Sequence, residues 1–266
     1  MTRIMRLIAA AALAVIGAGH ALAADMAVKP LYKAPPPPLP AFTWSGFFIG
    51  GHAGYAWGNT AWFQNEVGSG GGIPGFQDAS FTEKDWLGGG QAGFNYQLMG
   101  SPIVWGIWGD DTAGTIRGAA TRCFLDVPGT VQGCSSEIKN FGTLVGRVGY
   151  TFNQVMFYAL GGWAWAAGVD QANTCLGANC ANGVGISNTN YQNVFGYTVG
   201  GGVEYAFTGN WSIFAQYNYV DFGRWGENLT NQATQLAFTE NIRQNISVVK
   251  FGLNFRFGQP TVTLPP

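Results

Sequence analysis

The chain has 266 residues, a formal net charge of −1 at pH 7, 15% aromatic residues and only 10% charged residues. Ordinary soluble domains carry about 25% charged residues, so a soluble protein of this composition would expose a large apolar surface. The composition therefore favours contact with lipid, and the near-neutral charge gives no indication of a nucleic-acid partner.

The first 24 residues have the features of a cleaved secretory signal peptide. Arg3 and Arg6 form a basic start, Leu7 to Gly19 is uncharged, and Ala21 to Ala24 fits a small-residue cleavage site. A transmembrane anchor is the alternative, but 13 residues fall short of the about 20 that a membrane helix needs. We therefore expect residues 1–24 to be removed during export.

Residues 25–41 form a Pro-rich segment that includes four consecutive prolines, Pro35 to Pro38. Proline has no backbone donor and favours an extended polyproline conformation. The segment is expected to be a periplasmic spacer, and a leader without a role remains open as the alternative.

The first strand is predicted at Trp44–Gly58, because its apolar residues recur with a period of two. The larger apolar side chains share one parity, and small or polar side chains share the other. The first set is Phe47, Ile49, Ala53, Tyr55 and Trp57, and the second is Gly46, Gly50, His52 and Gly54. A membrane barrel needs this division between a lipid face and a packed lumen.

Seven more segments show the same alternation. They are Lys84–Leu98, Ile103–Ala119, Asn140–Phe152, Val155–Val169, Gln192–Phe207, Trp211–Gly223 and Arg243–Phe257. Bacterial outer-membrane barrels have an even number of antiparallel strands. The sequence therefore predicts an all-β fold, an eight-stranded antiparallel up-and-down transmembrane β-barrel over residues 42–257, followed by a short tail of residues 258–266.

The predicted connections alternate between short and long. Short turns fall at Met99–Pro102, Asn153-Gln154 and Thr208–Asn210, and long loops at Asn59–Glu83, Ala120–Lys139, Asp170–Tyr191 and Arg224–Ile242. Short periplasmic turns and long external loops are typical of outer-membrane barrels. A membrane helix over the uncharged stretch Val148–Val169 is the alternative there, but Asn153-Gln154 interrupts it.

Several motifs together resemble one family. They are WSGFFIGGHAGY from Trp44, VWGIWGD from Val104, GRVGY from Gly146, GGGVEY from Gly200, AQYNYVDFG from Ala215 and VKFGLNFRF from Val249. In this order and spacing they resemble the OmpA-like barrels of alphaproteobacteria, the small outer-membrane surface-antigen or porin-like family. The resemblance implies surface exposure, envelope stabilisation and in some cases contact with a host or ligand through the loops.

The sequence departs from this family at three places. Trp108 and Gln216 stand where members usually carry glutamates, and the chain continues past Phe257, where these barrels usually end on the aromatic strand. The partners that the resemblance implies are outer-membrane lipid and lipopolysaccharide, and the barrel-assembly machinery during insertion.

Five charged residues fall on the lumen parity of five different strands: Asp110, Arg147, Glu204, Lys250 and Arg256. Burying a charge is costly unless it is paired, so we expect an ion-pair network, with Gln216 and His52 as its neutral polar members. An eight-stranded barrel is only wide enough for side chains to fill. A packed, plugged lumen is therefore expected, with a narrow ion pore as the alternative.

Catalytic, metal and cofactor sites are not expected. His52 is the single histidine after the signal peptide, and no serine-acid arrangement or clustered ligands accompany it. A lipid-modifying barrel enzyme that uses His52 is kept only as a third hypothesis.

All four cysteines are predicted in external loops, and export into an oxidising compartment favours disulfides. Cys123 and Cys134 fall in the second long loop, and Cys175 and Cys180 in the third. Four cysteines allow three connectivities; Cys123–Cys134 and Cys175–Cys180 close the shortest rings and are expected, with a zinc site as the rival. The sequence thus favours a structural surface protein with stapled loops, and a narrow porin-like channel as the alternative.

Overall fold

The computed structural model describes residues 42–64, 75, 77–123, 131–176, 189–230 and 237–258. The chain divides into two compact units, residues 1–39 and 40–266, and every described residue belongs to the second. The expected signal peptide, the whole of the spacer and residues 259–266 of the tail lie outside the described residues.

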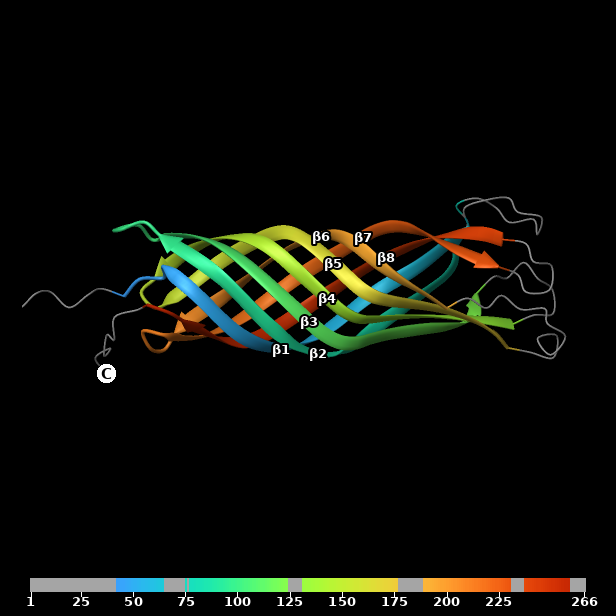
Figure 1. The fold of residues 1–266 in the computed structure, drawn as a ribbon, viewed down its shortest axis with the longest axis horizontal. Coiled ribbons are helices and arrows are strands. Elements are labelled where there is room, and N and C mark those ends of the chain that lie inside the picture. Colours follow the sequence, from blue (N-terminus) through green and yellow to red (C-terminus); the bar gives the residue numbers. More distant parts are fainter. Residues whose placement is uncertain are drawn as a thin grey trace, which may run out of the picture. The chain divides into compact units, whose positions relative to one another are not determined.

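Eight antiparallel strands form a closed barrel in chain order, as predicted (Figure 1). They are β1 Gly46–Gln64, β2 Gln77–Gln97, β3 Ile103–Cys123, β4 Val131–Phe152, β5 Val155–Leu176, β6 Thr189–Ala206, β7 Trp211–Thr230 and β8 Ala237–Arg256. The ring closes where β1 pairs with β8 along nearly its whole length. No helix in the described part of the chain is long and apolar enough to cross a membrane.

The three short turns lie where the sequence predicted them. β4 and β5 are joined by Asn153-Gln154, and Asn153 adopts a left-handed conformation with φ of 54°. Asparagine tolerates this conformation better than most residues, which suits a two-residue hairpin. The strand ends on this side of the barrel agree with the predicted ends to within two residues.

The opposite ends of the strands were predicted too short. β1 continues to Gln64 and β2 begins at Gln77, so much of the predicted loop Asn59–Glu83 is strand. β4 likewise begins at Val131 and β7 continues to Thr230. The strand bounds are predicted from the alternation of outward apolar residues, which is required only where a strand faces lipid. Strand pairing continues beyond the lipid, so the strands are longer than predicted.

The strands are staggered around the ring. Following the paired residues once around the barrel from Gly46 leads back to β1 at Ala56, ten residues further along. Each step to the next strand therefore climbs by a little over one residue. This stagger is linked to the inclination of the strands that a closed barrel requires, and the inclination is visible in Figure 1.

The outward side chains form two aromatic belts. Near the short turns, the exposed aromatic residues include Phe47, Tyr96, Trp105, Tyr150, Phe157, Tyr205, Trp211 and Phe257. Farther along the strands, a second belt contains Trp57, Trp86, Trp163, Phe195 and Tyr197. Aromatic girdles flank the lipid-exposed band of outer-membrane barrels, so these belts mark the limits of the membrane-spanning part.

Candidate functional site

The lumen near the short turns contains a layer of four aromatic side chains, Phe48, Trp108, Tyr158 and Phe214, called the aromatic layer below. They come from the alternate strands β1, β3, β5 and β7. The ring centroid of Trp108 lies 5.4 Å from that of Phe48, 6.5 Å from that of Tyr158 and 5.1 Å from that of Phe214. The layer therefore extends across the whole interior.

Glycines on the intervening strands make room for this layer. A Cβ atom added at Gly93 on β2 would lie 2.5 Å from the Phe48 ring. One added at Gly252 on β8 would lie 2.5 Å from the Phe214 ring. The alternation of large and small residues around the ring is how small barrels fill their interior.

Arg147 on β4 lies against the aromatic layer and is fully buried. Its guanidinium carbon is 4.8 to 5.1 Å from the ring centroids of Phe48, Trp108 and Tyr158. Arg147 Nη1 donates to Glu204 Oε2 at 3.0 Å, and Nε donates to Asn95 Oδ1 at 3.0 Å. Stacking and a direct ion pair together offset the cost of burying this cation.

Glu204 on β6 is shared by two arginines. Arg256 Nη2 lies 3.6 Å from Glu204 Oε1, which also accepts hydrogen bonds from Ser212 and Asn254. The Arg256 guanidinium stacks on Trp44, with 4.6 Å between its carbon and the ring centroid. Two buried cations therefore depend on one carboxylate.

A second ion pair lies higher in the lumen. Lys250 Nζ on β8 is 2.6 Å from Asp110 Oδ1 on β3, and Thr112 and Thr143 also donate to this carboxylate. Lys250 lies over the ring of Phe141 at 5.3 Å. The structure thus places all five charged lumen residues of the sequence analysis in ion pairs, arranged as two separate groups.

His52 and Gln216 hydrogen-bond to neutral side chains. The His52 ring nitrogens lie 2.6 Å from Gln91 Oε1 and 3.0 Å from Thr112 Oγ1. Gln216 Oε1 accepts from the hydroxyl of Tyr158 at 2.9 Å. Both ring nitrogens of His52 are occupied, and neither partner is a carboxylate.

Glu83 is a buried carboxyl at the end of the predicted loop Asn59–Glu83. It lies on β2, beyond Trp86 and outside the membrane-spanning part, and it faces inward with none of its surface exposed. Thr60 donates to Oε1 at 2.7 Å and Gln244 to Oε2 at 2.9 Å. Burial raises the pKa of Glu83, and hydrogen bonds from Thr60, Ser136 and Gln244 only partly oppose this. The signal that could have revealed it is the inward parity of Phe81, Glu83 and Leu87.

The cysteines were placed in loops, and this is wrong for three of them. Cys123 is the last residue of β3, Cys134 lies on β4 and Cys175 lies on β5, because these strands run beyond the lipid. Cys134 is buried and disulfide-bonded. The side chains of Cys123 and Cys175, and all of Cys180, lie outside the described residues, so the connectivity remains a prediction. Within the described residues, no group of three or more His, Cys, Asp or Glu could hold a metal ion.

The chain matches the family described as outer membrane protein beta-barrel domain over residues 9–257. It is 30% identical over 258 residues to the 31 kDa outer-membrane immunogenic protein of Brucella melitensis biotype 1, covering 95% of this chain and all of the relative. A 22 kDa outer membrane protein of Rhizobium leguminosarum is 27% identical over 221 residues, covering 83% of this chain and 82% of the relative.

Among solved structures, the outer membrane protein OprG from Pseudomonas aeruginosa aligns with a TM-score of 0.49 and 12% sequence identity. The alignment covers 80% of this chain and 96% of that chain. The likeness is too distant to inform the site.

Proposed function

Because the chain belongs to the outer membrane protein beta-barrel domain family, we propose that it is a non-enzymatic structural surface protein with a plugged lumen and disulfide-stapled outer segments. It is a multi-pass β-barrel of the outer membrane. The resemblance to small alphaproteobacterial barrels is confirmed by the relatives from Brucella and Rhizobium.

The aromatic layer is the main observation that supports a plugged lumen. Its four rings come from alternate strands, and Trp108 contacts each of the other three. Arg147 stacks against Phe48, Trp108 and Tyr158. An ion crossing this plane would have to displace tightly packed side chains, and protein interiors resist such displacement. Two further apolar clusters lie above this layer, around Phe141 and around Trp62.

A structural role also agrees with the state of His52. A general base needs a ring nitrogen within reach of a nucleophile and a group that orients the ring. Both His52 nitrogens are occupied by the neutral partners Gln91 and Thr112. If the protein were instead a lipid-modifying enzyme that depends on His52, His52→Ala would abolish activity on phospholipid vesicles; we expect no activity before or after the change.

Display at the cell surface is the third element of the proposal. The Brucella relative is named as an immunogenic outer-membrane protein. In this chain, the strands extend past the upper aromatic belt and carry the disulfide-bonded Cys134. Such an extension would hold the outer loops on a rigid support, and rigid scaffolds often present binding loops in this way.

Planar-bilayer conductance tests the plug against a narrow channel, the second candidate that the charged lumen residues favour. We expect no steady openings from the wild-type protein and ion-sized openings when Trp108→Ala/Phe214→Ala is combined with Phe141→Ala and Trp62→Ala, which open the two clusters above. The matched control is Trp163→Ala, which removes a ring from the outer wall and is expected to stay silent. Steady openings from the wild-type barrel would replace the plug with the channel.

A further inference from the structure

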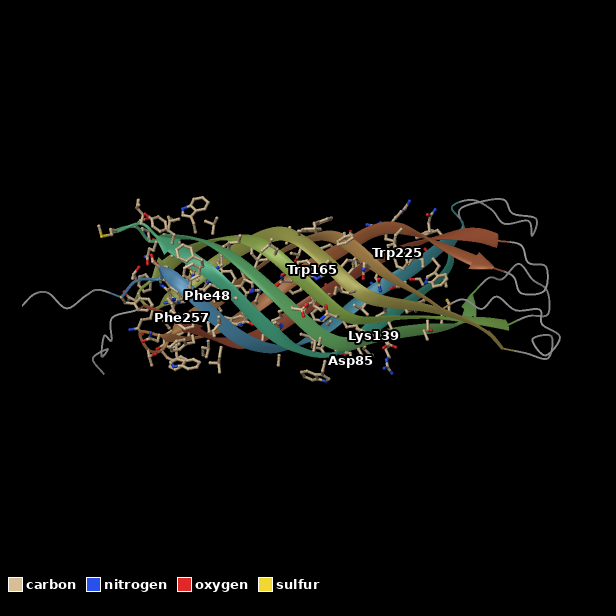
Figure 2. The ribbon with its side chains drawn as sticks, in the orientation of Figure 1. Phe48, Asp85, Lys139, Trp165, Trp225 and Phe257 are labelled. Atoms are coloured by element: carbon tan, nitrogen blue, oxygen red, sulfur yellow. The ribbon has the colours of Figure 1, made fainter. Side chains whose placement is uncertain are left out.

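Exposed basic side chains gather just beyond the upper aromatic belt. They are Lys84 on β2, Arg117 on β3, Lys139 on β4, Arg224 on β7 and Arg243 on β8. Once the stagger of ten residues per turn of the ring is taken into account, they lie within about two residues of one height. Figure 2 shows one of them, Lys139, on the loop side of Trp165.

Four of these residues form two like-charged pairs. Lys84 lies directly opposite Arg117 across β2 and β3, and Arg224 lies directly opposite Arg243 across β7 and β8. Like charges that face each other directly across a sheet destabilise it. The two pairs lie on either side of β1, which pairs with both β2 and β8.

Neighbouring acids neutralise only part of this charge. Arg117 lies 3.3 Å from Glu137, and Arg243 lies 3.6 Å from Asp221. Within the described residues, Lys84 forms no ion pair, and Arg224 stacks on the Phe63 ring at 5.3 Å without one. Each pair therefore keeps about one positive charge exposed on the outer wall.

The level of the two basic pairs on the barrel wall indicates which part of the membrane they face. Lys84 pairs with Trp57 of the upper aromatic belt and lies two residues beyond Trp86. Aromatic belts lie at the level of the lipid headgroups. Long basic side chains at this level reach the headgroups easily, and guanidinium groups bind phosphate or carboxylate through two parallel hydrogen bonds.

We propose that the pairs Lys84–Arg117 and Arg224–Arg243 each bind an anionic headgroup of lipopolysaccharide in the outer leaflet. An anion between the two cations removes their mutual repulsion and satisfies their donors. The site lies on the lipid-facing wall and goes beyond the structural function proposed for the lumen. It would fasten the barrel to the outer leaflet on both sides of β1.

The test is a titration of the purified full-length protein in dodecyl maltoside with fluorescently labelled rough lipopolysaccharide. Removing one basic group near an anionic lipid surface lowers binding about fivefold. We therefore expect Lys84→Gln/Arg117→Gln and Arg224→Gln/Arg243→Gln each to weaken one of the two sites about 25-fold, so that each double variant keeps one tight site. The variant with all four substitutions should bind weakly at both sites. Arg117→Lys keeps the charge but loses the two parallel hydrogen bonds, so it should weaken binding less than Arg117→Gln does. Asn59→Gln, a neutral change between the pairs, should bind like the wild type.

Two further probes identify the ligand. Phosphatidylcholine should bind weakly and equally to all variants, and inorganic phosphate should displace lipopolysaccharide only poorly. Folded small barrels migrate differently on a gel before and after heating. Only preparations that show this difference are compared, so a folding defect cannot imitate a loss of binding. Two tight sites in both double variants, as in the wild type, or displacement by millimolar phosphate alone, would overturn the proposal. Neither outcome bears on conductance, so the plugged lumen is tested separately.

Discussion

Two buried glutamates at different heights in the same lumen are compensated in opposite ways. Glu204, in the membrane-spanning part, has Arg147 and Arg256 beside it. Glu83, in the extension beyond the membrane, receives hydrogen bonds only from neutral side chains such as Thr60 and Gln244. Both are at most 1% exposed, so burial alone does not explain the difference.

The difference shows that the two parts of the lumen compensate a buried carboxyl group with different kinds of partner. Near the short turns, the interior combines large rings with paired charges. In the extension, Glu83 lies in a neutral polar layer close to the apolar cluster of Trp62, Phe81 and Ile242. A neutral, protonated carboxyl fits such a layer at much lower cost than a carboxylate does.

The largest expected effect comes from removing the shared carboxylate. Glu204→Gln would leave Arg147 and Arg256 buried without their counterion, and breaking a buried ion pair costs about 3–5 kcal/mol. We expect the free energy of unfolding to fall by that amount. Urea titration of the detergent-folded barrel, followed by tryptophan fluorescence, measures it. A loss below about 1 kcal/mol would mean that the stacking on Trp108 and Trp44 suffices to hold the arginines.

The part of this comparison that lies in the membrane could be read largely from the sequence. Arg147, Glu204 and Arg256 are predicted to point inward because the residues next to each of them on its own strand are apolar and point outward. Contact with lipid imposes this strict period of two. What could not be read is which charges meet. Asp110 pairs with Lys250, 140 positions away in sequence, and that contact depends on barrel closure and stagger.

The extension was harder to predict for a physical reason. Beyond Trp57 and Trp86, the outward side chains no longer face the hydrocarbon of the lipid, so residues such as Thr82 and Lys84 break the apolar alternation while the strand continues. The lumen side does keep large residues there, including Trp62 and Phe81. Following the inward parity as well as the outward one would have extended the strands.

A smaller effect is expected at the second ion pair. Lys250→Met leaves Asp110 without its cation, although Thr112 and Thr143 still donate to it. We expect a loss of about 3 kcal/mol, at the lower end for a broken buried pair. Asp110→Asn/Lys250→Met should recover most of this loss in the same urea titration, because a neutral pair needs no counterion. Simple addition of the two single losses would show that the residues act independently.

The smallest effect, and the one of opposite sign, is expected at Glu83. Burial raises its pKa in the folded barrel above the value of 4.5 for an exposed glutamate. Below that pH the carboxyl is protonated in both states, and its contribution to stability is complete; as the pH rises through the folded-state pKa, this contribution is lost. Glu83→Gln should remove this pH dependence and stabilise the barrel at pH 7 by about 1 kcal/mol or less, the scale of one neutral hydrogen bond.

The surroundings of Glu83 favour this outcome. Gln244 Oε1 is buried without a hydrogen-bond partner and could accept from an amide at position 83. The groups facing Glu83 from β1, β4 and β8 are Thr60, Ser136 and Gln244, all neutral, and Gly118 faces it from β3. Urea titrations between pH 4 and pH 8 measure the effect, with Glu137→Gln, on the outer face of β4, as the matched control. If Glu83→Gln were less stable than the wild type at neutral pH, the carboxyl would have to be ionised and stabilised in place, and the contrast with Glu204 would disappear.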